Sequence, residues 1–361
     1  MKVPAIPQGP SEATPEWFTA VLHAGGALDA DGRVTAVEPT RVGNGLVGES
    51  VRFVLSYAAP TAAAAPTSVV CKFGASDAEI RKVGRSELVY LREVRFYQRI
   101  AATVGIRTPK IFLAAIDDMT HDFVLVMEDL GPARGGDQIV GCSVADAAVV
   151  MDAAAALHGP RWADPSIEGA DWDLRAEKIP LIQAGYPRIF ARYRELFGHV
   201  NTAEELAIGE RFVPVIERWF AGQRRPWTVT HGDFRLDNML FDVRGGAEPL
   251  AVVDWQTILP GPGVSDVSYF LGGCLSVEDR RAHERALLRR YHEALGRFGV
   301  KGYDFERCWQ EYRYNAFMGY YVCSFEAPIV PRTERGDRMF ATWLSRTSRQ
   351  ILDLDVLSLL P

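Results

Sequence analysis

The feature that most constrains the fold is a change in hydrophobic pattern near Gly131. Residues 30 to 128 contain five strand-like apolar runs and one stretch, 77 to 102, whose apolar residues recur at helical spacing. The pattern predicts an α+β fold, in which a small mixed β-sheet with one main helix joins a larger, mostly helical part. Helical spacing beyond Gly131 covers 143–158, 186–198, 203–222, 277–298, 303–325 and 334–353.

The same change predicts two lobes. We expect residues 1–130 to form an N-terminal lobe that opens with a helix capped by Thr14, and 131–361 to form the helical lobe. The segment GPARGGD, 131 to 137, is the expected link between them. In the second lobe only the short runs WTVT, MLFD and LAVVDW have the character of strands.

Composition excludes several classes of protein. A net charge of −6 argues against nucleic-acid binding through a basic face, and no apolar run is long enough to cross a membrane. The first residues, MKVPAIPQGPSEATPEW, lack the apolar centre of a signal peptide. The five cysteines are scattered and form no CxxC pair, so we expect a cytoplasmic protein without a disulfide framework. The oligomeric state stays open.

The segment HGDFRLDNMLF, 231 to 241, carries the strongest chemical signal. It lies between two strand-like runs, and it presents Asp233 and Asn238 in one tight turn. Asp254 ends the next strand-like run, so if the two runs pair as a hairpin, Asn238 and Asp254 lie at adjacent strand ends. An amide oxygen and a carboxylate suit Mg²⁺, and Asp233 beside them can accept a proton from a hydroxyl. Phosphoryl transfer needs this arrangement.

A glycine-rich segment, GNGLVGES, precedes the second strand-like run. It holds Gly43, Gly45 and Gly48, but the residues after it alternate like a strand, whereas a dinucleotide-binding motif needs a helix there. Two interpretations remain open. The glycines form either a flexible cover over nucleotide phosphates or a plain hairpin turn.

Three motifs together resemble those of a known superfamily. HGDFRLDN, VVDWQ and GPGVSDVSYFL are similar to motifs of the aminoglycoside phosphotransferase and choline kinase-like superfamily. The similarity is greatest to its ecdysteroid-kinase-like, or CHK kinase-like, branch and covers roughly residues 35 to 325. The resemblance implies a bilobal protein-kinase-like fold that uses ATP and Mg²⁺ to phosphorylate a hydroxyl of a small molecule.

The resemblance also implies a nucleotide site in the first lobe. Lys72, in SVVCKFG, stands where the family has its phosphate-binding lysine, although a solvated strand lysine is the alternative. Glu93 fits the family pattern of its ion-pair partner, with Glu87 and Glu79 as rivals. With Asn238 and Asp254 as metal ligands, these residues would hold Mg·ATP.

At the end of the first lobe, the resemblance implies that backbone groups around Glu128 and Leu130 bind the adenine. In the second lobe, Asp266 is either a helix N-cap or a brace for the catalytic loop, and His231 is expected to orient that loop. Whether Arg235 and Asp237 face substrate or water is left open.

The aromatic run 303–325 has two interpretations, core packing or a site for a cationic head group. The acceptor is open as well: an aminoglycoside, amino alcohol, sugar, steroid or hydroxyacyl thioester is compatible with the sequence. A protein kinase is disfavoured, because Gly232 replaces the arginine of its HRD motif and only residues 255–265 separate Asp254 from Asp266. A catalytically inactive kinase-like binding module is the alternative from another class.

Overall fold

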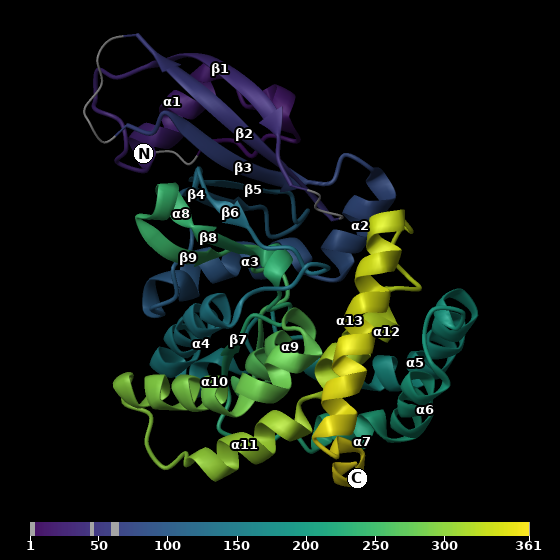
Figure 1. Ribbon diagram of the computed structural model, residues 1–361. Helices are drawn as coiled ribbons and strands as arrows, with labels where there is room; N and C mark the ends of the chain where they lie inside the picture. Colours follow the sequence, from purple (N-terminus) through teal and green to yellow (C-terminus); the bar gives the residue numbers. More distant parts are fainter. Residues whose placement is uncertain (1–3, 44–46, 59–64, 361) are drawn as a thin grey trace.

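The computed structural model describes residues 4–43, 47–58 and 65–360. A narrow lobe built on a β-sheet stands on a broader helical lobe (Figure 1). The sheet has five strands in the order β1-β2-β3-β5-β4. They are β1 (Val34–Arg41), β2 (Gly48–Tyr57), β3 (Ser68–Gly74), β4 (Ile111–Ile116) and β5 (Phe123–Glu128).

The prediction of a mixed sheet is wrong, because every neighbouring pair in this sheet is antiparallel. The helical connection leads from β3 to β4, and these two strands run in the same direction. Strand β5 lies between them, however, so no parallel neighbours form.

One face of the sheet is covered by α1 (Pro15–Ala24), the helix expected at the N-terminus. The Thr14 hydroxyl accepts a hydrogen bond from the Trp17 backbone N–H, which caps the first turn. Phe18 is fully buried, and its ring centroid lies 4.9 Å from that of Phe53 on β2. Burial of each such side chain stabilises the lobe by about 2–3 kcal/mol.

The single helix expected over 77–102 is broken. Helix α2 (Ala78–Ser86) ends before α3 (Val89–Arg95), and a π-helical turn follows from Phe96 to Ile100. Leu88 between them has a left-handed φ of 53°. The break brings the Tyr90 ring against Gly84, where a Cβ atom would lie only 2.4 Å from the ring.

The helical lobe follows the predicted order, with three differences. Helix α5 starts at Arg175 rather than near 186, and it includes Pro180 and Pro187. A 3₁₀ turn over Val213–Val215 divides 203–222, and Asn315 with Ala316 divides 303–325. The helices are α4 (Val144–His158), α5 (Arg175–Phe197), α6 (Ala203–Phe212), α7 (Ile216–Ala221), α8 (Val243–Gly246), α9 (Val264–Cys274), α10 (Val277–Arg297), α11 (Phe305–Tyr314), α12 (Phe317–Glu326) and α13 (Glu334–Asp353).

Short strands carry the chain past the junction of the lobes. Strand β8 (Met239–Asp242) pairs with β9 (Glu248–Val252) as an antiparallel hairpin, so the pairing that the sequence left as a condition is present. The link adds β6 (Arg134–Gly135) to its edge. Beneath lies a two-stranded sheet of β7 (Thr228–Thr230) and β10 (Leu259–Gly261). Among the residues described, no helix combines the length and apolarity that a membrane span requires.

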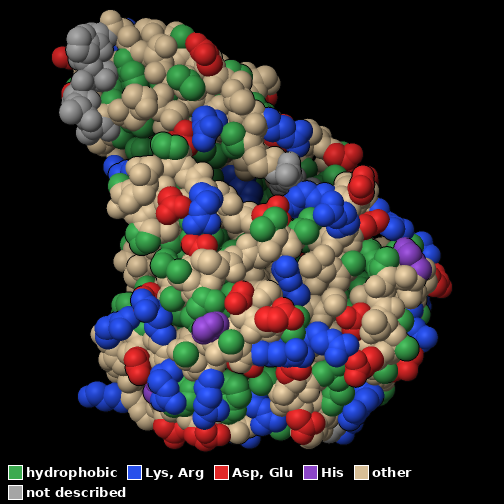
Figure 2. Space-filling view, viewed as in Figure 1, with side chains coloured by type: hydrophobic (Ala, Val, Ile, Leu, Met, Phe, Trp, Pro, Cys, Tyr) green, Lys and Arg blue, Asp and Glu red, His purple; other side chains and the backbone are tan. Residues whose placement is uncertain are grey.

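The junction between the lobes is hollowed in the space-filling view, where the sheet lobe rises from the helical lobe (Figure 2). One apolar core runs across it, from Tyr90 and Val94 of α3 into the helical lobe. The stacked rings of Phe96 and Trp255, with centroids 3.8 Å apart, join the two lobes at this point.

Candidate active site

The loop that follows β7 is held from below by Asp266 of α9. Its carboxylate accepts hydrogen bonds from the backbone N–H groups of His231, at 2.7 Å, and Gly232, at 3.1 Å. The Nε2 atom of His158 lies 3.2 Å from the same carboxylate. Asp266 is in the first turn of α9 rather than at its N-cap, which is Gly263. Its geometry is that of a brace for the loop.

Gly232 is required by the backbone at this point. Its φ is +80°, and a Cβ atom would lie 2.3 Å from the carbonyl oxygen of Thr257. The neighbouring His231 ring contacts the Val253 carbonyl oxygen through Nε2, at 3.1 Å, and its Nδ1 accepts from the Asp233 N–H. The histidine therefore fixes the shape of the loop, as expected.

Asp233 is held by three donors. Oδ2 accepts hydrogen bonds from Arg235 Nε, at 3.0 Å, and Asn238 Nδ2, at 2.9 Å. Oδ1 accepts one from the Tyr269 hydroxyl, at 2.7 Å. Burial opposes ionisation, but attraction to Arg235 and the hydrogen bond from Tyr269 outweigh it, so the pKa of Asp233 lies below its ordinary value.

Asn238 and Asp254 lie at adjacent strand ends. The Val253 N–H donates to the Asn238 carbonyl at 3.0 Å, and the Asn238 Nδ2 donates to Asp233. With its amide nitrogen engaged there, Asn238 keeps its side-chain oxygen for another partner. Asp254 has a left-handed φ of 67°, an uncommon conformation that clusters at functional sites.

Lys72 reaches Asp254 from the sheet lobe. Its Nζ donates to Asp254 Oδ1 at 2.9 Å and lies 2.7 Å from Glu93 Oε2. The rival acids lie elsewhere: Glu87 pairs with Lys178, and Glu79 is in the exposed first turn of α2. Lys72 is buried and ion-paired, so the alternative of a solvated strand lysine is wrong.

One cation is thus shared by two carboxylates. Burial alone would lower the pKa of Lys72, but attraction to Asp254 and Glu93 raises it. Burial raises the pKa of Glu93 to about 7 despite the nearby lysine, and the charge of Asp254 adds to that shift. The Asp254 side chain is 27% exposed, so its carboxylate can bind a divalent cation in addition to Lys72.

The glycine-rich segment connects β1 to β2, as the alternating pattern predicted. Gly43 has a φ of +73°, and Gly48 begins β2. A Cβ atom on Gly48 would lie 3.3 Å from Lys72 Cε, so this backbone covers the lysine closely. Gly45 lies outside the described residues.

At the end of the sheet, the Glu128 N–H donates to the Lys110 carbonyl at 2.8 Å, and its side chain pairs with Arg107. Leu130 is buried with Val243 and Ala251 in a small apolar cluster. The Glu128 side chain therefore forms an ion pair at the junction of the lobes.

The structure shows the contacts of the residues whose roles the sequence left open. Arg235 bridges Asp233 and Asp237, and its Nη1 lies 2.8 Å from Asp237 Oδ2. Tyr312 and Tyr320 are fully buried, which favours core packing for most of the aromatic run. The sequence did not single out Tyr269, which contacts Asp233. The available signal was its spacing of three residues from Asp266, because this spacing places both side chains on one face of α9.

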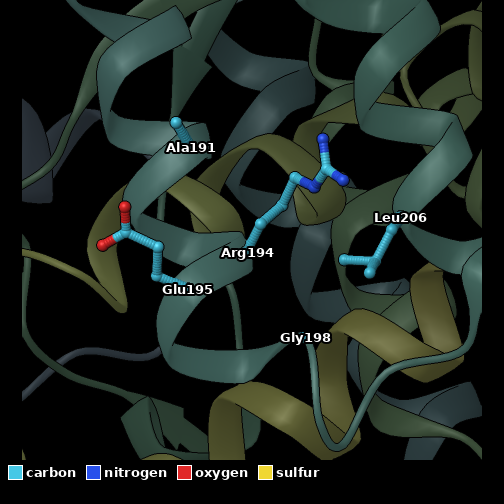
Figure 3. Close-up of a pocket in the computed structure, with 5 residues that line it drawn as sticks. All are labelled: Ala191, Arg194, Glu195, Gly198 and Leu206. Carbon is cyan, nitrogen blue, oxygen red and sulfur yellow. The ribbon is translucent and has the colours of Figure 1, made fainter.

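A further hollow lies on the surface of the helical lobe. It is bounded by Ala191, Arg194, Glu195 and Gly198 on or beside α5, and by Leu206 of α6 (Figure 3). None of these residues belongs to the cluster around Asp233. We therefore place the chemistry at the junction of the lobes.

A small antiparallel sheet lobe and a helical lobe bring a lysine, two aspartates and an asparagine together where they meet. This arrangement defines a phosphotransferase with the protein-kinase-like fold. The chain belongs to the phosphotransferase enzyme family, whose model matches residues 75–308. Its members transfer a phosphoryl group to a hydroxyl acceptor. Among curated proteins, none matches the chain.

Solved structures share the fold at low identity. The chain is similar to a microcompartment-associated aminopropanol kinase, with a TM-score of 0.53 and 14% identity over 94% of this chain and 99% of that one. It is also similar to the GDP complex of wild-type aminoglycoside 2′-phosphotransferase-IIIa, with a TM-score of 0.53 and 15% identity over 87% and 93%. A third is an aminoglycoside phosphotransferase bound to GDP and kanamycin, with a TM-score of 0.52 and 14% identity over 95% and 98%.

Proposed function

We propose that this enzyme transfers the γ-phosphoryl group of ATP to a hydroxyl of a small molecule, with Asp233, Asn238, Asp254 and Lys72 as its working residues. The observation that carries the proposal is their convergence at the junction of the lobes: Lys72 pairs with Asp254, and Asn238 bonds Asp233. The two lobes, 1–130 and 131–361, would meet around the nucleotide. Five free cysteines support a cytoplasmic setting.

Each residue has a role that its contacts support. Asp233, ionised and with its side chain 22% exposed, orients the acceptor hydroxyl and takes up its proton. Lys72, held by Glu93, binds the phosphates beneath the glycine-rich segment. Asn238 and Asp254 supply the amide oxygen and carboxylate that suit Mg²⁺, which when bound neutralises phosphate charge. Because Mg²⁺ keeps waters and phosphate ligands, two protein ligands suffice.

Backbone groups near Glu128 and Leu130 are proposed to bind the adenine, beside the apolar cluster that contains Leu130. Among the acceptors, an aminoglycoside or amino alcohol agrees with the substrates named for similar structures, one an aminopropanol kinase and one bound to kanamycin. The ecdysteroid-kinase-like branch stays a proposal from the sequence motifs. An inactive kinase-like binding module is the alternative.

Two variants test the assignment of roles. We expect Asp233→Asn to abolish ATP turnover and to bind Mg·ATP with wild-type affinity, because it removes the base and leaves the nucleotide site intact. We expect Asp254→Ala to lose the Mg²⁺-dependent part of ATP binding. An ATP-consumption assay measures turnover, and isothermal titration with ATP, with and without Mg²⁺, measures the affinities of the two variants. Full turnover by Asp233→Asn would contradict the role of Asp233 as the base. Unchanged Mg·ATP affinity in Asp254→Ala would contradict the role of Asp254 as a metal ligand.

A further inference from the structure

The hydrogen bonds of Asp233 restrict which of its oxygens can meet a substrate. Oδ2 accepts two hydrogen bonds, from Arg235 and Asn238. Oδ1 accepts one, from the Tyr269 hydroxyl at 2.7 Å. Each carboxylate oxygen has two lone pairs, so among the described residues the open one belongs to Oδ1. The side chain is 22% exposed, which leaves room for a hydroxyl to approach.

Tyr269 is fixed more firmly than a substrate-binding side chain would be. It is 2% exposed, and its ring meets Trp343 of α13 edge-on, with centroids 4.9 Å apart. Burial raises the pKa of Tyr269 well above its ordinary value, so the hydroxyl remains a donor at every physiological pH. The same α9 holds the loop through Asp266.

We propose that Tyr269 is a positioning residue, whose hydroxyl holds the Asp233 carboxylate in one orientation and leaves a single lone pair of Oδ1 for the acceptor hydroxyl. The inference rests on the proposed function, because Asp233 needs positioning only if it meets an acceptor. Arg235 donates to the opposite oxygen, Oδ2. Like Tyr269, Arg235 also contacts α13, where its Nη1 lies 3.2 Å from the Met339 sulfur. Asp233 is therefore held between two groups that α13 supports.

The groups that face Asp233 determine what changes when the Tyr269 hydroxyl is removed. His231 and Arg235 face it from its own loop, Tyr269 from α9, and Cys323 and Glu326 from α12. Removing the Tyr269 hydroxyl takes one hydrogen bond from Oδ1 of the charged carboxylate, while the contacts of Arg235 and Asn238 with Oδ2 remain. The carboxylate is then held from one side only.

The test measures Mg²⁺-dependent ATP hydrolysis, with water as the acceptor, by phosphate release at pH 7. For Tyr269→Phe we expect a kcat that is at least about tenfold lower, because the carboxylate is no longer held in the productive orientation. The Kd for Mg·ATP should stay at the wild-type value. Because burial raises the pKa of Glu326 to about 7, the rates are measured again in the Glu326→Gln background.

Tyr320→Phe is the matched control. Tyr320 is also a buried tyrosine of this lobe, and its hydroxyl donates to the Glu205 carbonyl at 2.8 Å without touching Asp233. We expect this variant to keep the wild-type rate. An equal loss of rate in both variants would mean a general packing effect and would overturn the proposal, as would a wild-type rate in Tyr269→Phe.

Two further proteins separate this inference from the proposed function. If Tyr269→Phe does not fold, Tyr269→Met removes the same hydroxyl with a side chain that fills the space flexibly, and a wild-type rate in that variant overturns the inference. Hydrolysis by Asp233→Asn at the wild-type rate would instead refute the role of Asp233 and the inference with it. Loss of activity in Asp233→Asn, with a wild-type rate in Tyr269→Phe, would refute the inference alone.

Discussion

At the scale of single residues, the site depends on two uncommon backbone conformations. Gly232 and Asp254 both have left-handed φ values, +80° and +67°. The sequence showed Gly232 as the absence of a kinase arginine, whereas the structure gives it a positive reason, the contact with the Thr257 carbonyl. Aspartate tolerates the left-handed region better than most residues, so Asp254 can turn its carboxylate toward Lys72.

Glu326 at the end of α12 gives a prediction for pH dependence. Burial, with the nearby charge of Asp233, raises its pKa from 4.5 to about 7. The folded chain therefore binds a proton that the unfolded chain has released, and stability falls as the pH rises through this interval. Glu326→Gln removes the effect. We expect its Tm to exceed that of the wild type by about 3 °C at pH 8 and to equal it at pH 4.5. An equal difference at both pH values would contradict this.

At the scale of elements, α9 organises the site, because Asp266 and Tyr269 both point from it to the catalytic loop. Asp266→Ala would leave two buried backbone N–H groups without acceptors. We expect this substitution to lower the free energy of unfolding by about 3 kcal/mol or more, measured by urea denaturation.

Asp304→Ala provides the comparison for that measurement. Asp304 also accepts from a backbone N–H, that of Arg307, but it does so as the exposed N-cap of α11. Its loss should cost about 1 kcal/mol. A loss of the same size in both variants would mean that the brace has no special importance.

The helices show which features could be predicted from the sequence and which could not. A local signal predicted the cap at Thr14, and it forms. Local signals could not predict the break at Leu88, because apolar spacing continues through it. The resemblance paired Lys72 with Glu93, and the two side chains form an ion pair. The one signal for Tyr269 was its spacing of three residues from Asp266, which does not show that its hydroxyl meets the loop.

At the scale of the whole molecule, the two lobes meet through charges as well as through the shared core. Arg107 pairs with Glu128 of β5 and with Glu248 of β9, and Arg244 pairs with Glu128. The Val252 N–H adds a hydrogen bond to the Arg107 carbonyl at 2.9 Å. These partly exposed pairs are each worth little energy, so they fix an orientation rather than lock the lobes.

Transfer of the γ-phosphoryl group from radiolabelled ATP to an acceptor tests the central claim most directly. The wild type and Asp233→Asn are compared with Mg²⁺ and a panel of aminoglycosides, amino alcohols, sugars, steroids and hydroxyacyl thioesters. The account predicts a labelled product with one acceptor class in the wild type and none in Asp233→Asn, although both bind Mg·ATP. Labelled product at an equal rate in both proteins would contradict it. So would a wild type that neither binds Mg·ATP nor labels any acceptor, and that result would favour the inactive binding module.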